Sequence, residues 1–234
     1  MKPFLLLSLC LFHSFVLSTT NNAFNIQFIF NNVDSSEQAT VQKAAARWQE
    51  LITKGFGSTL TLSSGTQICN QTISQKLVVQ DLLVFVSVQP IDGVGGNLAR
   101  TGPCGFDTSG NVRLSSMEFD SADLPTLLSD NKFPAVALHE MGHALGVGTV
   151  WDRKNLLLDD YAVDLILYRG VNGADENGQV GVSGQPKVQP NGGPGIARIH
   201  WEKSVYGNEL MTPYITGNTQ PLSILTAASL IDIG

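Results

Sequence analysis

The sequence predicts a mixed α+β fold, and three patterns support that prediction. Apolar residues alternate with polar ones over residues 24–30, which indicates a half-buried strand. Residues 82–88 form an apolar run of strand length, which is typical of a central strand covered on both faces. Residues 41–52 carry apolar side chains at helical spacing, and residues 134–145 form a second helix between an N-terminal proline and a glycine stop.

The remaining elements of the first half follow from local signals. Asp34 offers an N-cap with an acidic first turn for the first helix, and Gly55 is expected to end it. Residues 60–62 are predicted to form a short strand. Residues 93–96 are glycine-rich and predict a turn. They are not a phosphate-binding loop, because no Gly-Lys-Ser/Thr follows and no helix starts there.

In the second half, we predict a helix over residues 154–168 with one face formed by Leu158, Tyr161, Leu165 and Tyr168. Residues 170–195 are rich in glycine and proline, which predicts an irregular, mobile loop. Residues 222–233 are predicted to form a terminal helix whose inward side chains are Leu225, Ala228, Leu230 and Ile231. No linker divides the chain convincingly, so we expect one domain with two lobes.

Composition limits the possible classes of protein. Hydrophobic residues make up 43% of the 234 residues, which is enough for a substantial core and excludes a disordered or collagen-like chain. The formal net charge is −6. A nucleic-acid-binding protein normally carries a basic stripe, and none is visible, so we expect no nucleic-acid partner.

The N-terminus resembles a secretory signal peptide. Lys2 supplies a positive charge, residues 4–17 are almost entirely apolar, and Ser18 is a small residue before the expected cleavage point. The apolar run is too short for a transmembrane helix, which needs about 20 residues. The alternative is a buried N-terminal helix. We predict a signal peptide over residues 1–18, a mature chain over 19–234, and a secreted product without a stable membrane span.

Removal of the signal peptide leaves two cysteines, Cys69 and Cys104. An even pair of cysteines in an oxidising compartment predicts one disulfide between them. Asn70 begins an Asn-Gln-Thr triplet, which is a possible N-glycosylation site and is consistent with secretion.

The chemistry is carried by the motif H-E-x-x-H, formed by His139, Glu140 and His143. Residues four apart on a helix share one face, so both imidazoles can bind the same Zn²⁺. Glu140 then lies where it can take a proton from zinc-bound water. The motif also occurs by chance on helix surfaces. Here the apolar flanks and the clear start and stop of the helix favour a zinc site.

A catalytic zinc needs a third protein ligand, and two kinds are available. In the metzincin pattern H-E-x-x-H-x-x-G-x-x-H, the third histidine would fall at Thr149. The remaining candidates are His200 and a group of aspartates, namely Asp159, Asp160 and Asp164. We favour His200, because Gly146 matches the metzincin turn and the glycine-rich loop can bring residue 200 back. Met211 then follows in what looks like a Met-turn.

Together with His200-Trp201-Glu202 and Glu209-Leu210-Met211-Thr212, the helix motif resembles the leishmanolysin-like metallopeptidases. The resemblance covers residues 24–234. It implies a metzincin (zincin-like) catalytic domain with a twisted, mostly parallel mixed sheet, a backing helix, an active-site helix and a small C-terminal lobe. It also implies an insertion over residues 147–199 and a Met-turn that places Met211 beneath the metal.

The sequence therefore predicts a secreted zinc endopeptidase that hydrolyses proteins or peptides, binds one catalytic Zn²⁺ and acts as a monomer. Residues Leu98 and Ala99 resemble the metzincin edge strand that pairs with an extended substrate, although an ordinary loop is the alternative. A secreted, non-catalytic zinc-binding module and an inactive homologue are the rival functions. The intact Glu140 argues against the second of these.

Overall fold

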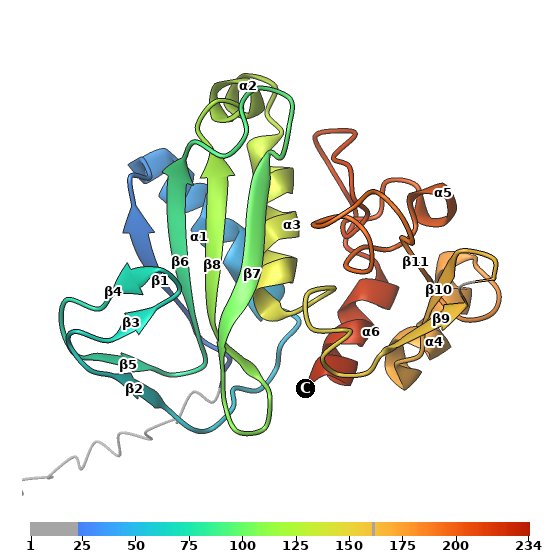
Figure 1. The fold of residues 1–234 in the computed structure, drawn as a ribbon, viewed down its shortest axis with the longest axis horizontal. Coiled ribbons are helices and arrows are strands. Elements are labelled where there is room, and N and C mark those ends of the chain that lie inside the picture. Colours follow the sequence, from blue (N-terminus) through green and yellow to red (C-terminus); the bar gives the residue numbers. More distant parts are fainter. Residues whose placement is uncertain (1–22, 161) are drawn as a thin grey trace, which may run out of the picture.

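The computed structural model describes residues 23–160 and 162–234, so the predicted signal peptide of residues 1–18 lies outside the described residues. Two groups of elements lie on either side of helix α3 (Phe133–Leu145), as Figure 1 shows. The first group contains the main sheet. The second contains the C-terminal strands and helices.

The main sheet has the strand order β1-β6-β8-β7. Strands β1 (Ile26–Asn31), β6 (Leu82–Gln89) and β8 (Val112–Asp120) run parallel, whereas β7 (Ala99–Phe106) pairs antiparallel with β8 at the edge. The predicted mixed sheet is therefore confirmed. The side chains of β6 alternate between two apolar cores, one on each face of the sheet, which is the arrangement that its continuous apolar sequence predicted.

Helices α1 (Ser35–Gln49) and α3 cover one face of this sheet. A capping box between Asp34 and Glu37 starts α1, as predicted. The helix ends at Gln49, before the expected stop at Gly55, and the backbone amides of Leu51 and Ile52 beyond its end both donate hydrogen bonds to the carbonyl of Trp48. The Trp48 indole donates a hydrogen bond of 2.9 Å to the carbonyl of Leu138, which joins the two helices. A short helix, α2 (Leu124–Ser129), precedes α3.

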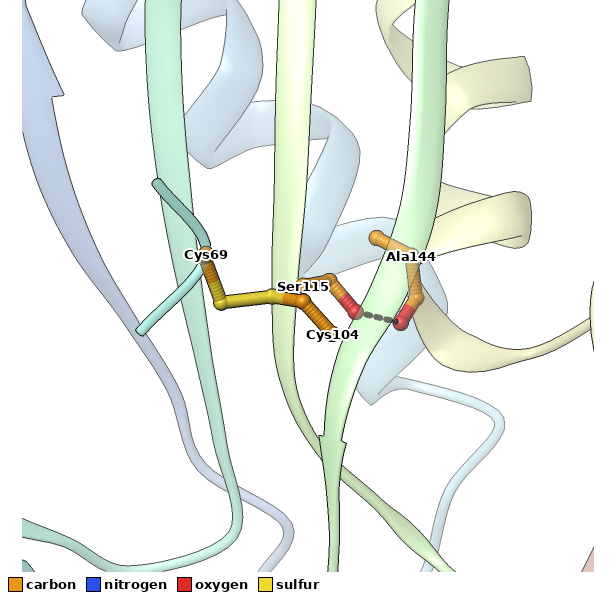
Figure 2. Close-up of a disulfide and its surroundings, with 4 residues drawn as sticks. All are labelled: Cys69, Cys104, Ser115 and Ala144. Atoms are coloured by element: carbon orange, nitrogen blue, oxygen red, sulfur yellow. Dashed lines mark hydrogen bonds between the residues drawn. A yellow bond between two sulfur atoms is a disulfide. The ribbon is translucent and has the colours of Figure 1, made fainter. Parts of the chain in front are cut away.

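Helix α3 was predicted over residues 134–145 and begins one residue earlier. Gly146 has φ = 112° and ends the helix in the left-handed conformation that glycine favours. At the same end, the Ser115 hydroxyl donates a hydrogen bond of 2.7 Å to the carbonyl of Ala144, which fixes the helix to the central strand β8 (Figure 2).

The opposite face of the main sheet is covered by two antiparallel strand pairs, the second of which is a hairpin. One pairs β2 (Leu60–Leu62) with β5 (Leu77–Val79), and the other pairs β3 (Gln67–Ile68) with β4 (Gln71–Thr72). Cys69 and Asn70 form the turn of the β3–β4 hairpin with φ values of 53° and 58°, as two-residue hairpin turns require. Asn70 is exposed there.

The predicted disulfide is present between Cys69 in this hairpin turn and Cys104 in β7, with a Cα–Cα distance of 5.4 Å (Figure 2). We expect the double variant Cys69→Ser/Cys104→Ser to lose about 2–4 kcal/mol of unfolding free energy, because the bond closes a loop over a sequence separation of 35. Thermal unfolding of this variant measures the effect, and reduced wild-type protein is the control. An unchanged midpoint, or two free thiols in the oxidised protein, would contradict the prediction.

The prediction of a helix over residues 154–168 was wrong. These residues form the hairpin of β9 (Leu157–Asp160) and β10 (Leu165–Tyr168), to which β11 (Lys187–Val188) adds a third antiparallel strand. Burial along β10 alternates with the period of a strand, and its buried Tyr168 packs against Trp151 and Trp201. Long-range packing therefore overrides the local pattern. Tyr161 lies outside the described residues.

The region predicted as an irregular loop is partly ordered. It contains α4 (Val171–Glu176), a 3-10 turn η1 (Asn177–Val180) and β11. The Asp232 carboxylate accepts hydrogen bonds from the Tyr168 hydroxyl and from the backbone amides of Asn172 and Gly173, which ties this region to the C-terminal helix.

Helix α5 (Lys203–Tyr206) precedes α6 (Ile224–Ile233), which begins two residues later than predicted, after the N-cap Ser223. Leu225 and Ala228 face inward as expected, but Ile231 is 68% exposed, so its predicted inward position was wrong. Across the part of the chain that the structure describes, no helix has the length and apolar character needed to cross a bilayer.

Candidate metal centre

Helix α3 is buried on most sides, and it carries the buried side chains of His139, Glu140 and His143. The exposed fractions of these side chains are 6%, 7% and 4%. The one-turn spacing places the two imidazoles next to each other, with ring centroids 4.7 Å apart. Burial raises the pKa of Glu140, while the neighbouring His139 acts in the opposite direction.

His200 comes to the same point from the far end of the segment that follows Gly146. Its Nε2 atom lies 3.1 Å from His139 Nε2 and 3.1 Å from His143 Nε2. The sequence separation from His143 is 57, so the chain returns to α3 after passing through the second group of elements. Among the described residues, His139, His143 and His200 form the one cluster of at least three possible metal ligands.

The other nitrogen of each imidazole contacts a backbone carbonyl. His139 Nδ1 lies 2.7 Å from the carbonyl of Leu210, and the Nδ1 atoms of His143 and His200 lie 2.9 Å from the carbonyls of Val147 and Ile196. A carbonyl only accepts hydrogen bonds, so each Nδ1 carries the proton and each Nε2 presents a lone pair.

Three lone pairs directed at one point fit a metal cation. Tetrahedral Zn²⁺ with Zn–N distances of about 2.1 Å separates its ligand nitrogens by about 3.4 Å, close to the spacing observed here. Burial and the neighbouring histidines lower the pKa of His143 well below its usual value. Burial, with a smaller effect of the neighbouring His139, lowers the pKa of His200 to about 3. Both rings are therefore neutral, as metal binding requires.

The aspartates considered as alternative ligands lie elsewhere. The Asp159 carboxylate is bound by the guanidinium of Arg198, and the Asp160 carboxylate accepts a hydrogen bond from the amide of Ala162. Asp164 has φ = 49° in the turn between β9 and β10. None of these residues belongs to the histidine cluster.

Met211 lies directly against α3. A Cβ atom added to Gly142, which stands between His139 and His143 in the sequence, would come within 2.7 Å of the Met211 Sδ atom. Met211 is fully buried. The glycine therefore permits the close approach of the methionine to the part of the helix that carries both histidines.

A buried carboxylate, whose role the sequence motif did not indicate, holds this turn in place. Glu209 accepts hydrogen bonds from the Met211 amide at 2.6 Å, the Ser223 hydroxyl at 2.7 Å and the Thr226 hydroxyl at 2.5 Å. Burial raises the pKa of Glu209. The same turn supplies the Leu210 carbonyl to His139, so Glu209 fixes both the methionine and a hydrogen-bond partner of one histidine.

The histidines and Glu140 line a cleft of about 360 Å³. One wall is the beginning of the edge strand β7, where the buried Thr101 hydroxyl lies beside Glu140 and acts to lower the pKa of its carboxyl, against the larger effect of burial. Nothing in the sequence pattern had singled out Thr101. The cleft is also lined by a largely apolar group of residues, namely Ile196, Ile199, Pro213, Tyr214 and Ile215.

A mixed sheet backed by a helix that bears H-E-x-x-H, with a third histidine brought in from a later segment, is the arrangement of a metallopeptidase domain. Comparison with known families identifies the metallopeptidase family. The family model described as leishmanolysin matches residues 38–234, so the chain belongs to the leishmanolysin family of zinc-dependent metallopeptidases, as its sequence motifs predicted. A comparison with curated proteins finds no match.

Proposed function

We propose that this protein is a secreted zinc endopeptidase in which His139, His143 and His200 hold one Zn²⁺ and Glu140 is the catalytic base. The observation that carries the proposal is the convergence of three Nε2 lone pairs beside a buried glutamate in one cleft. When bound, zinc supplies Lewis acidity, which polarises a peptide carbonyl and makes water acidic near neutral pH.

Glu140 performs the proton transfers in this mechanism. Its carboxylate takes a proton from the attacking water and then passes it to the nitrogen of the leaving amine. Burial raises the pKa of Glu140, which favours both steps because a stronger base accepts the proton and still releases it near neutral pH. The backbone carbonyls that bind each Nδ1 keep the three imidazoles oriented throughout.

The edge strand β7 provides a surface for the substrate. In the described residues β7 pairs with β8 on one side, and its first residues line the cleft. An extended peptide can add to this edge as a further strand, which would place a carbonyl group near Glu140. The apolar residues that also line the cleft, such as Ile196 and Ile215, favour an apolar substrate side chain.

Met211, in this proposal, is the Met-turn residue beneath the metal. The disulfide between Cys69 and Cys104 supports an oxidising compartment, and with it the removal of residues 1–18 as a signal peptide. The exposed Asn70 is a glycosylation acceptor in the same proposal. We propose one zinc ion per chain and a monomer made of a single catalytic domain over residues 19–234, with the insertion over 147–199.

The experiment that tests the function measures zinc content together with cleavage of casein. We expect one zinc per chain and cleavage that a chelator abolishes and added zinc restores. A secreted, non-catalytic zinc-binding module would retain zinc without cleaving casein or a peptide library. That result would reject the endopeptidase.

A pair of variants tests the third ligand. We expect His200→Ala to lose zinc and activity, because two imidazoles remain where three converge. Asp164→Ala should retain both, because Asp164 lies in a hairpin turn outside the histidine cluster. Metal analysis after dialysis distinguishes them. Loss of zinc in the aspartate variant, with retention in the histidine variant, would reject the three-histidine site.

A further inference from the structure

Arg198 lies two residues before His200, in the segment that returns the third imidazole to α3. Its backbone has φ = 72°, a left-handed conformation that a non-glycine residue adopts only when surrounding contacts hold it. The contacts of its side chain identify what holds it.

The Arg198 guanidinium binds two carboxylates at once. Its Nε and Nη2 atoms donate to the two oxygens of Asp152 at 2.8 and 2.6 Å. Nη1 and Nη2 donate to the two oxygens of Asp159, the second at 3.3 Å. Asp152 follows the glycine turn at the end of α3, and Asp159 lies in β9. These bonds hold the pKa of the Asp152 carboxyl below its usual range, so the carboxylate stays charged.

Backbone contacts transmit this attachment to His200. The amide of Arg198 donates to the carbonyl of Gln189, and the amide of Gln189 donates to the carbonyl of His200, both at 2.8 Å. The carbonyl of Ile199, between Arg198 and His200, packs onto Gly148. A Cβ atom added to Gly148 would lie 1.9 Å from the Ile199 carbonyl oxygen. The end of the 147–199 segment is therefore attached to its beginning at Arg198, through Asp152, and packs on it at Ile199, the residue that precedes the third histidine.

We propose that Arg198, held by Asp152 and Asp159, is a positioning residue that preorganises His200 for zinc binding. The inference rests on the proposed zinc site. The positioning role explains why this residue is an arginine. A planar guanidinium can donate hydrogen bonds to two carboxylates in a fixed geometry, whereas a lysine ammonium acts as a single point charge. The inference also gives Asp159 a role that differs from metal ligation.

A role in general stability makes a different prediction from a positioning role. If Arg198 only stabilised the second group of elements, its loss would lower the melting temperature of the metal-free protein and leave zinc affinity unchanged. If it positions His200, zinc affinity falls, and the geometry of the bound metal changes. Cobalt(II) replaces zinc in such sites and reports that geometry through its visible absorption spectrum.

The experiment compares Arg198→Gln, Arg198→Lys and Asp159→Asn with wild type and with the control Arg47→Gln, which removes an exposed ion pair to Glu50 on α1. The measurements are the zinc dissociation constant by chelator competition, the cobalt(II) spectrum and the melting temperature of the metal-free protein. We expect Arg198→Gln to weaken zinc binding by about 10–100-fold with an altered cobalt spectrum. Arg198→Lys should restore part of that affinity, and Arg47→Gln should behave as wild type.

Asp159→Asn keeps one carboxylate for the arginine, so it tests the inference in a protein that retains half of the attachment. We expect a smaller loss of zinc affinity in the same direction. Wild-type zinc affinity and cobalt spectrum in both Arg198→Gln and Asp159→Asn would overturn the positioning role while leaving the zinc site intact. Failure of wild type to bind zinc, or wild-type affinity in His200→Ala, would instead overturn the proposed function and this inference with it.

Discussion

Glu140→Gln is expected to lower kcat/KM for peptide hydrolysis by about 10²–10⁴-fold while zinc remains bound. Glutamine has the shape of glutamate, so the packing of this buried position on α3 is preserved. An amide does not accept the proton of the attacking water, and that transfer is the step assigned to Glu140. The three histidines keep their backbone carbonyl partners, so metal binding does not depend on the substituted group. Steady-state cleavage of a fluorogenic peptide, with zinc analysis of the same sample, measures both effects.

Glu50→Gln provides the matched control. Glu50 is exposed at the end of α1 and pairs only with Arg47 in the described residues, so the same chemical change there should leave cleavage unaltered. Cleavage by Glu140→Gln at more than a tenth of the wild-type rate would assign the base to another residue.

Gly148→Ala is expected to destabilise the folded protein by about 3–5 kcal/mol. A Cβ atom at this position would lie 1.9 Å from the Ile199 carbonyl oxygen, and the backbone of Gly148 has φ = 77°. Neither the carbonyl nor the left-handed backbone can adjust without moving the segment next to His200. We therefore expect a melting temperature about 10 °C or more below wild type, together with weakened zinc binding, by scanning calorimetry and metal analysis.

Gly178→Ala is the control for this substitution. Nothing lies within 4 Å of a Cβ atom added at Gly178, and its φ is outside the left-handed region. Its unfolding free energy should stay within about 0.5 kcal/mol of wild type. Equal melting temperatures for Gly148→Ala and wild type would show that Ile199 does not pack on this glycine in solution.

The parts of the fold that sequence patterns predicted are those set by local forces. Helix α3 has a proline near its start and a glycine at its end, and β6 is apolar on both faces because both faces are covered. The hairpin of β9 and β10 was mistaken for a helix because its apolar residues also fit helical spacing. Pairing with β11 and packing on distant tryptophans decide its conformation, and neither is visible in a short window.

The same distinction applies to the site. His139, Glu140 and His143 lie within one turn of a helix, so their proximity follows from helix geometry alone. His200 could be favoured only through motif resemblance, because a return over 57 residues depends on the whole second half of the fold. The roles of Arg198 and Glu209 were missed because they arise from hydrogen bonds to particular side chains elsewhere in the second half of the fold, such as those of Asp159 and Thr226, and such bonds leave no periodic signal in the sequence.

The aromatic packing in the second half of the fold has a spectroscopic consequence. Trp151 and Trp201 are both fully buried, and their ring centroids lie 4.4 Å apart. Indole rings this close couple their electronic transitions, which produces a strong near-ultraviolet circular dichroism signal when the pair is rigid. The third tryptophan in the chain, Trp48, lies between α1 and α3 and is remote in sequence from this pair. Trp201 follows His200 directly in the chain. The circular dichroism signal of the coupled tryptophan pair therefore reports whether the backbone beside the third histidine is ordered, and no added label is needed.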